Sequence, residues 1–119
     1  MNTQLEVGEL AFAKIVVENG PEFYMNELEV DMGRERSMQG PKYFCIGESN
    51  TISKNHARIF WKDDSFYIAN LSKNKVSIQI LTVQIHVNQR ELIQTAEPMP
   101  LKNMTFIMIS KVKLCFLLP

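Results

Sequence analysis

Short runs in which every second residue is apolar set the strongest limit on how this chain can fold. The run from Glu27 to Met32, for example, alternates acidic residues with Leu28, Val30 and Met32. A period of two places the apolar side chains on one face of a β-strand, whereas an amphipathic helix needs a period of about 3.6. The pattern therefore favours strands, and no helical pattern longer than about ten residues is present.

Runs typical of strands occupy most of the chain: 11–17, 22–25, 27–32, 43–46, 56–62, 65–70, 75–88, 105–109 and 112–118. We expect the long run 75–88 to fold back once near Leu81-Thr82. The clearest hairpin turns at Lys62-Asp63-Asp64, and its inward residues are expected to be Ile59, Trp61, Phe66 and Ile68. About ten short strands, with no alternation of strand and helix, predict an all-β sandwich of two sheets.

Length and charge narrow the class of protein. A chain of 119 residues can bury a single core, so one domain is expected. Its 13 basic and 13 acidic side chains cancel, whereas a duplex-binding domain usually carries a basic excess. We therefore expect no nucleic-acid binding by this domain.

No apolar run approaches the ~18 residues of a membrane helix, and no secretory signal is seen, so no membrane association is expected.

Cysteine usage agrees with a reducing compartment. Cys45 and Cys115 lie in apolar runs and lack CxxC spacing, so we expect reduced, buried thiols instead of a disulfide. The absence of targeting signals permits either the nucleus or the cytoplasm.

Three short polar motifs lie between the expected strands, in this order: Gly33-Arg34, then Ser53-Lys54-Asn55-His56, then Ser72-Lys73-Asn74. Taken alone, each has an ordinary explanation. Arg34 lies in a charged run and would be solvated, Ser53 would cap a turn, and the third motif would be a polar turn. The order of all three resembles the ligand-binding loops of a forkhead-associated (FHA) domain, a module that binds phosphothreonine.

The resemblance runs from Ala13 to Pro119 and implies an FHA-like β-sandwich over residues 11–119, with an N-terminal extension at 1–10. It implies about 10–11 short, mostly antiparallel strands in two sheets, with the binding loops at one end. The spacing between the first two motifs resembles the subgroup found in forkhead-type transcription factors and fungal regulators of ribosomal-protein genes. That placement implies a nuclear protein, with the cytoplasm as the alternative.

The resemblance also assigns roles to individual residues. Arg34 would be the main phosphate ligand, because its planar fork can bond two phosphate oxygens. Ser53 would donate from its hydroxyl and its backbone N–H, and Lys54 and Lys73 would add positive charge to the phosphate site. Three further residues complete the set: Asn74 would bind the peptide backbone, and Gly33 and His56 would brace the loops.

Two departures from the family pattern leave a second function open. Lys75 stands where the family has a glycine, so a turn that needs a positive φ would be strained. The stretch 85–89 resembles one that in the family follows this turn almost at once. Here about nine additional residues are inserted between the turn and that stretch. The leading hypothesis is a phosphothreonine-peptide binding module in a transcription regulator. The alternative is a degenerate FHA fold that binds proteins, or a second copy of itself, without phosphate.

An enzyme has little support in this sequence. Paired carboxylates, a metal-spaced His/Cys cluster, a glycine-rich nucleotide loop and a nucleophile–base pair are all missing from its motifs. We therefore expect no catalytic residues, no metal and no cofactor. The expected partner is a phosphothreonine-containing protein, and the oligomeric state is left open.

Overall fold

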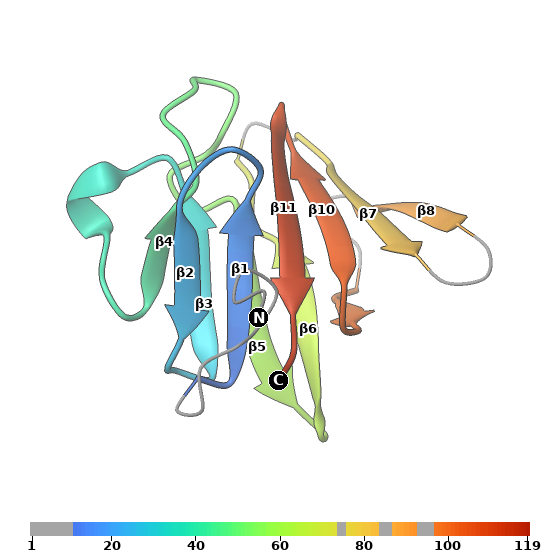
Figure 1. Ribbon diagram of the computed structural model, residues 1–119. Helices are drawn as coiled ribbons and strands as arrows, with labels where there is room; N and C mark the ends of the chain where they lie inside the picture. The colour runs from blue at the N-terminus through green and yellow to red at the C-terminus, as the bar shows by residue number, and fades with distance from the viewer. Residues whose placement is uncertain (1–10, 74–75, 84–86, 93–96) are drawn as a thin grey trace.

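The computed structural model describes residues 11–73, 76–83, 87–92 and 97–119 (Figure 1), so the predicted N-terminal extension at 1–10 lies outside it. Its strands are β1 (Ala13–Val17), β2 (Glu22–Met25), β3 (Glu29–Gly33), β4 (Tyr43–Cys45), β5 (Ala57–Lys62), β6 (Ser65–Asn70), β7 (Ile78–Val83), β8 (Val87–Leu92), β9 (Met99–Leu101), β10 (Thr105–Ile109) and β11 (Val112–Leu117). Within these ranges the helical structure is a single 3₁₀ turn, η1 (Arg36–Met38). No helix there is long and apolar enough to span a membrane.

The strands form two sheets that face each other (Figure 1). One has six strands in the order β2-β1-β11-β10-β7-β8, and the other has five in the order β4-β3-β5-β6-β9. The strand pairs are antiparallel except β3 with β4, which is parallel. The predicted all-β sandwich of short, mostly antiparallel strands is therefore confirmed.

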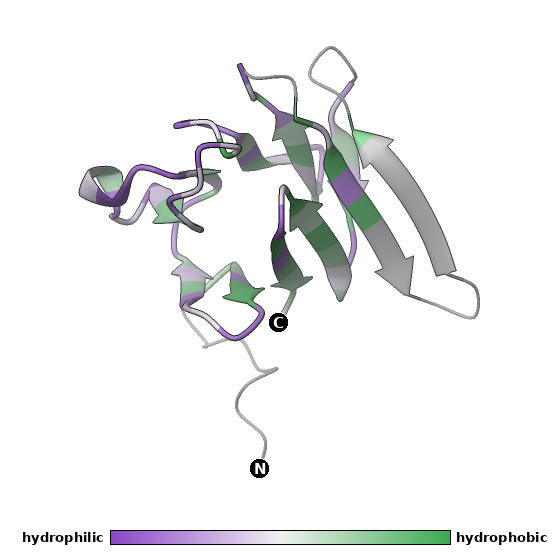
Figure 2. Ribbon diagram, turned by 90° about the horizontal axis from the view of Figure 1, so that it is seen from above, coloured by the Kyte–Doolittle hydropathy of each residue, from purple (hydrophilic) through white to green (hydrophobic). Residues whose placement is uncertain are grey.

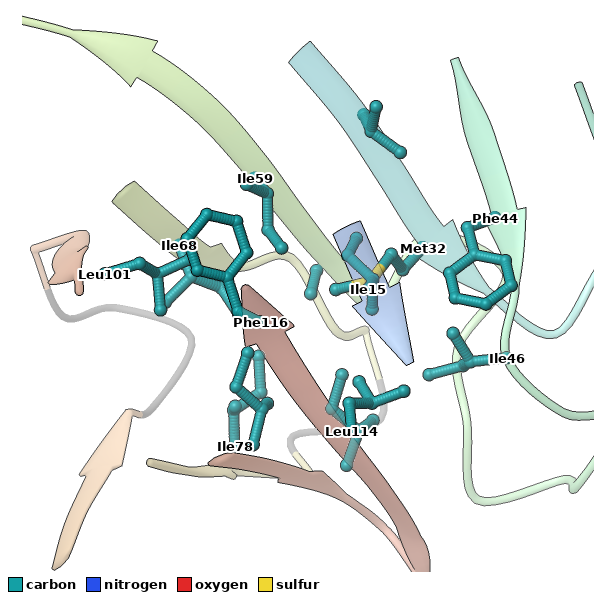
Figure 3. Packing of buried hydrophobic residues seen from close by; sticks show 14 of the residues in the cluster. Ile15, Met32, Phe44, Ile46, Ile59, Ile68, Ile78, Leu101, Leu114 and Phe116 are labelled. Atoms are coloured by element: carbon teal, nitrogen blue, oxygen red, sulfur yellow. The ribbon is translucent and has the colours of Figure 1, made fainter. Parts of the chain in front are cut away.

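The core lies between the sheets and is built by the period-two alternation (Figure 3). In β3, Val30 and Met32 are fully buried while Glu29 faces solvent. Across the core, the ring of Phe66 on β6 meets the edge of Phe116 on β11, with ring centroids 5.5 Å apart. The two sheets thus bury one continuous apolar layer, which supplies the main stabilisation of the fold.

Trp61, predicted to face inward, is 43% exposed instead. Leu28, which continues the apolar alternation of β3, is 45% exposed. The Trp61 N–H donates to the Leu28 carbonyl at 2.9 Å, which places both residues where β3 begins and β5 ends. The alternation carries them to the inner face, but at the rim of the sandwich, where solvent reaches them. Trp61 still packs edge-on against Phe66, with 5.0 Å between ring centroids.

The C-terminal half corrects the expected strand boundaries. Leu81 lies inside β7 and pairs with Gln89, so the chain reverses between Val83 and Val87 and not at Leu81-Thr82. Strand β9 was not predicted, because its three residues include Pro100 and are too short to show alternation. Proline is tolerated there because β9 is an edge strand. Cys45 and Cys115 are free thiols, but they are half-buried and not buried as predicted, because both point away from the core on their strands.

Matched truncations test the placement of the core. Ile59→Ala and Leu28→Ala remove the same three carbons from neighbouring positions, but Ile59 is fully buried and Leu28 is 45% exposed. We expect Ile59→Ala to lower the free energy of unfolding by about 2–5 kcal/mol, and Leu28→Ala to change it by about 0.5 kcal/mol or less. Urea denaturation measures both. Equal losses for the two variants would contradict the assignment of Ile59 to the core and of Leu28 to the solvent-accessible rim.

Candidate functional site

Three loops meet at one end of the sandwich and surround a cleft of about 640 Å³. They follow β3, precede β5 and follow β6, and Figure 2 looks down on this end, where the loops are largely hydrophilic. The cleft is lined by Arg34, Asn50, Ser53, Lys54, Asn55, Leu71 and Lys73. Three of these lining residues are cationic and none is acidic, so the cleft is suited to an anion.

Gly33 allows the first two loops to approach each other closely. A Cβ at this position would lie 1.8 Å from the Lys54 carbonyl oxygen and 2.5 Å from its carbonyl carbon. Both atoms are backbone and cannot move aside cheaply, so a side chain would force the loops apart. The Gly33 carbonyl also accepts a bond from the Ile46 N–H at 2.9 Å. Gly33 therefore makes the close backbone contacts that its predicted bracing role requires.

Arg34 leaves β3 at this contact and reaches the second loop. Its backbone N–H donates to the Ser53 carbonyl at 3.2 Å, and its Nη1 donates to the Ile52 carbonyl at 2.8 Å. The second bond uses one of the five N–H donors of a guanidinium. The side chain is therefore anchored at the cleft while most of its donor capacity still faces solvent.

The buried ring of His56 joins the second loop to the third. The Ser53 N–H donates to Nδ1 at 3.0 Å, and Nε2 lies 3.1 Å from the Val76 carbonyl oxygen. Because Nδ1 accepts a bond, the proton is assigned to Nε2, which donates to Val76. The Ser53 N–H is therefore bonded to His56 in this structure, and its predicted donation to phosphate stays a prediction. The Ser53 Oγ accepts a bond from the Lys73 N–H at 3.1 Å.

The Val76 carbonyl is a meeting point for three side chains. Besides His56, it accepts bonds from Asn70 Nδ2 at 3.1 Å and from Ser72 Oγ at 3.0 Å. Asn70 Oδ1 also accepts the Ser72 N–H at 2.9 Å, which is an Asx turn. Sequence reasoning missed Asn70 and Ser72 as supporting residues, although an asparagine two residues before a serine in a turn is a usable signal.

Tyr43 on β4 connects the first loop to the second by hydrogen bonds. Its hydroxyl donates to the Lys54 carbonyl and accepts the Glu35 N–H at 3.0 Å. Burial is the main cause that raises the pKa of Tyr43, so the hydroxyl keeps the proton that it donates. Nothing in the sequence marked Tyr43, because it lies in a run that predicts only a strand.

The structure brings most of the predicted site residues together. The four predicted phosphate ligands, Arg34, Ser53, Lys54 and Lys73, all line the cleft. The predicted bracing residues Gly33 and His56 lie beneath it and are buried. Asn74, the predicted ligand of the peptide backbone, and Lys75 lie outside the described residues, so the role of Asn74 stays a prediction. Asn50, Asn55 and Leu71 also line the cleft and were not predicted.

Comparison with known proteins identifies this arrangement. The family model described as "FHA domain" matches residues 30–110. The chain belongs to the FHA family. The matched range begins in β3 and ends after β10, so it includes all three loops of the cleft.

Solved structures share the fold of this FHA domain at low sequence identity. The FHA domain of an Arabidopsis thaliana hypothetical protein aligns over 89% of this chain and 84% of its own, with 14% identity and a TM-score of 0.65. EmbR from Mycobacterium tuberculosis, in complex with a low affinity phosphopeptide, aligns over 91% of this chain with 17% identity and a TM-score of 0.63. This chain spans only 24% of EmbR. The FHA domain of CT664 from Chlamydia trachomatis aligns over 88% and 95% of the two chains, with 16% identity and a TM-score of 0.58.

The His56 brace predicts a pH dependence of stability. Burial lowers the pKa of His56 below its usual 6.5, partly opposed by the bond to the Val76 carbonyl. Below about pH 6.5 the unfolded chain therefore binds a proton that the folded chain refuses, so the contribution of neutral His56 is lost as pH falls. We expect His56→Gln to be less stable than the parent at pH 8, with a gap that narrows towards pH 5 by up to about 1.4 kcal/mol per unit.

Urea midpoints of the parent and His56→Gln between pH 5 and 8 measure this gap. His86, the other histidine, is present in both proteins and cancels in the difference. A gap that stays constant across the range would contradict the lowered pKa.

Proposed function

We propose that this FHA domain binds a phosphothreonine-containing segment of a partner protein in the cleft, with no catalytic step. The observation that carries the proposal is the convergence of Arg34, Lys54 and Lys73 on one cleft in a chain of zero net charge. A phosphate group carries about −1.5 to −2 charges at neutral pH and three acceptor oxygens. Three cations from three loops match both properties.

The lining residues differ in what they offer the ligand. The anchored Arg34 presents a planar fork suited to two phosphate oxygens, whereas Lys54 and Lys73 are point charges that neutralise without fixing direction. The Ser53 hydroxyl lies between the second and third loops, where it already bonds the Lys73 N–H. Leu71, half-buried on the same wall, offers an apolar contact to the threonine methyl group, a contact that phosphoserine lacks. The EmbR structure, which contains a phosphopeptide, supports this class of ligand.

A matched pair of arginines tests the proposal. Arg34 lines the cleft, whereas Arg36 on η1 is exposed and pairs with Glu48 at 2.6 Å. A binding peptide is first selected from an oriented library of phosphothreonine peptides. We expect Arg34→Ala to weaken its binding by about 1.5–3 kcal/mol, the range for a charge-assisted hydrogen bond, or roughly ten- to a hundred-fold. Arg36→Ala should leave binding unchanged, and calorimetry measures both.

Three versions of the selected peptide serve as controls: phosphothreonine, phosphoserine and unmodified threonine. Only the methyl distinguishes the first two, and burying it contributes about 0.8 kcal/mol or more. Equal affinity for the first and third, or no effect of Arg34→Ala, would overturn the proposal. That result would favour the alternative of a phosphate-independent interaction module. The presence of Lys75 at the position of the family's glycine supports that alternative.

We further propose that the parent protein is a nuclear transcription regulator, with the domain recruiting a phosphorylated partner. The support is the sequence resemblance to FHA domains of forkhead-type transcription factors and of fungal regulators of ribosomal-protein genes. Fluorescence microscopy of the tagged full-length protein in its native cells should show nuclear signal. Signal confined to the cytoplasm would contradict this assignment while leaving phosphopeptide binding intact.

A further inference from the structure

The outer face of the six-stranded sheet carries charged residues such as Lys14 on β1 and Lys113 on β11, but β10 presents large apolar side chains on it. In β10, Thr105, Ile107 and Ile109 point into the core, while Phe106 and Met108 point outward and are 39% and 37% exposed. An antiparallel sheet with one solvated face normally carries polar residues on that face. Two large apolar side chains in succession indicate a face that is covered in the functional state.

The position of Phe106 and Met108 separates them from the other exposed apolar residues. Phe12, Leu28, Trp61 and Met104 lie in loops or near strand ends, Met38 lies in η1, and Tyr24 lies on an edge strand. By contrast, β10 is an interior strand between β11 and β7, as Figure 1 shows from this side of the molecule. Phe106 pairs with the half-buried Cys115, and burial raises the pKa of that thiol, so it remains neutral. The part of the face formed by Phe106 and Cys115 is thus uncharged.

A groove of about 290 Å³ runs over this face. It is lined by Glu18, Gln79, Phe106, Ile107, Met108, Lys113 and Leu114. Glu18 and Lys113 are neighbours, since the Glu18 N–H donates to the Lys113 carbonyl at 2.9 Å. Among the ion pairs of the described residues, however, neither charge has a partner. One acid and one base therefore lie side by side at the edge of an apolar groove.

We propose that this face is a self-association surface, on which two copies of the chain pack about a two-fold axis. Phe106 and Met108 of each copy contact the same residues of the other, and Glu18 of each copy faces Lys113 of the other. A two-fold interface must be self-complementary, and an apolar centre beside one acid and one base has that property. A uniformly acidic or basic partner would leave one of the two charges opposed, whereas a second copy matches both.

The surface is separate from the phosphate cleft. The cleft belongs to the loops at the end of the sandwich, whereas Phe106 lies on the broad side of a sheet. A dimer therefore leaves both clefts open. If the proposed phosphopeptide function holds, two clefts in one particle favour a partner with two phosphothreonines, because the second binding event becomes intramolecular.

Sedimentation velocity of the whole chain over a range of concentrations tests the proposal. We expect a reversible monomer–dimer equilibrium, weakened at least about ten-fold by Phe106→Asp, as for the central residue of an interface. Leu28→Asp places the same charge on a similarly exposed apolar residue, just before β3 of the other sheet, and should leave the equilibrium unchanged. A monomer at every concentration, or equal effects of the two variants, would overturn the proposal.

Charge reversal tests the two-fold geometry with variants at solvent-exposed positions, where folding is least at risk. Glu18→Lys and Lys113→Glu should each weaken the dimer several-fold, because symmetry repeats every like-charged contact twice. The double variant restores opposite charges and should recover most of the parent affinity. Failure of that recovery would overturn the pairing of Glu18 with Lys113. Phosphopeptide affinity should be unchanged in all of these variants, which separates this proposal from failure of the cleft.

Discussion

The binding end of this FHA domain depends on one carbonyl oxygen. Val76 accepts hydrogen bonds from three side chains: His56 in the loop before β5, Asn70 at the end of β6 and Ser72 in the loop after β6. His56 carries the constraint onward, since its other nitrogen holds the Ser53 N–H. Of these three donors, the histidine is the one that comes from the second loop. Its two ring nitrogens make both bonds, one as donor and one as acceptor.

The fold could largely be predicted from sequence because its determinants are local. Alternation within β3, β5, β6, β10 and β11 and the polar turns between them are visible in single short windows. The errors arise where the environment of a residue depends on its place in the whole fold and not on the local sequence pattern. Trp61 continues the alternation of β5 but sits beyond the point where the sandwich is closed, and β9 exists only because β6 offers it an edge. Neither fact is written in the neighbouring residues.

The sequence motifs predicted which residues line the site, and the structure added which hydrogen bonds their atoms make. Motif order alone predicted that Arg34, Ser53 and Lys73 share one cleft, although the first and the last are 39 positions apart in the sequence. What the motifs lacked was the use of each atom. The Ser53 N–H belongs to His56, and the Lys54 carbonyl is held by Tyr43, a residue with no motif of its own. The role of a side chain can be inferred from its residue type, whereas the hydrogen-bond partners of buried backbone groups are determined by the packing of the folded chain.

The order of strands in the six-stranded sheet also governs how the chain is made. Lys14 of β1 pairs with Leu117 of β11, about 100 residues later. Synthesis proceeds at about 5–20 residues per second, so roughly 5–20 seconds separate the two partners. Throughout that interval β1 has β2 on one side and an unsatisfied backbone edge on the other. A nascent domain of this topology therefore exposes an unpaired strand edge, a site prone to wrong pairing, until its last strand closes the sheet.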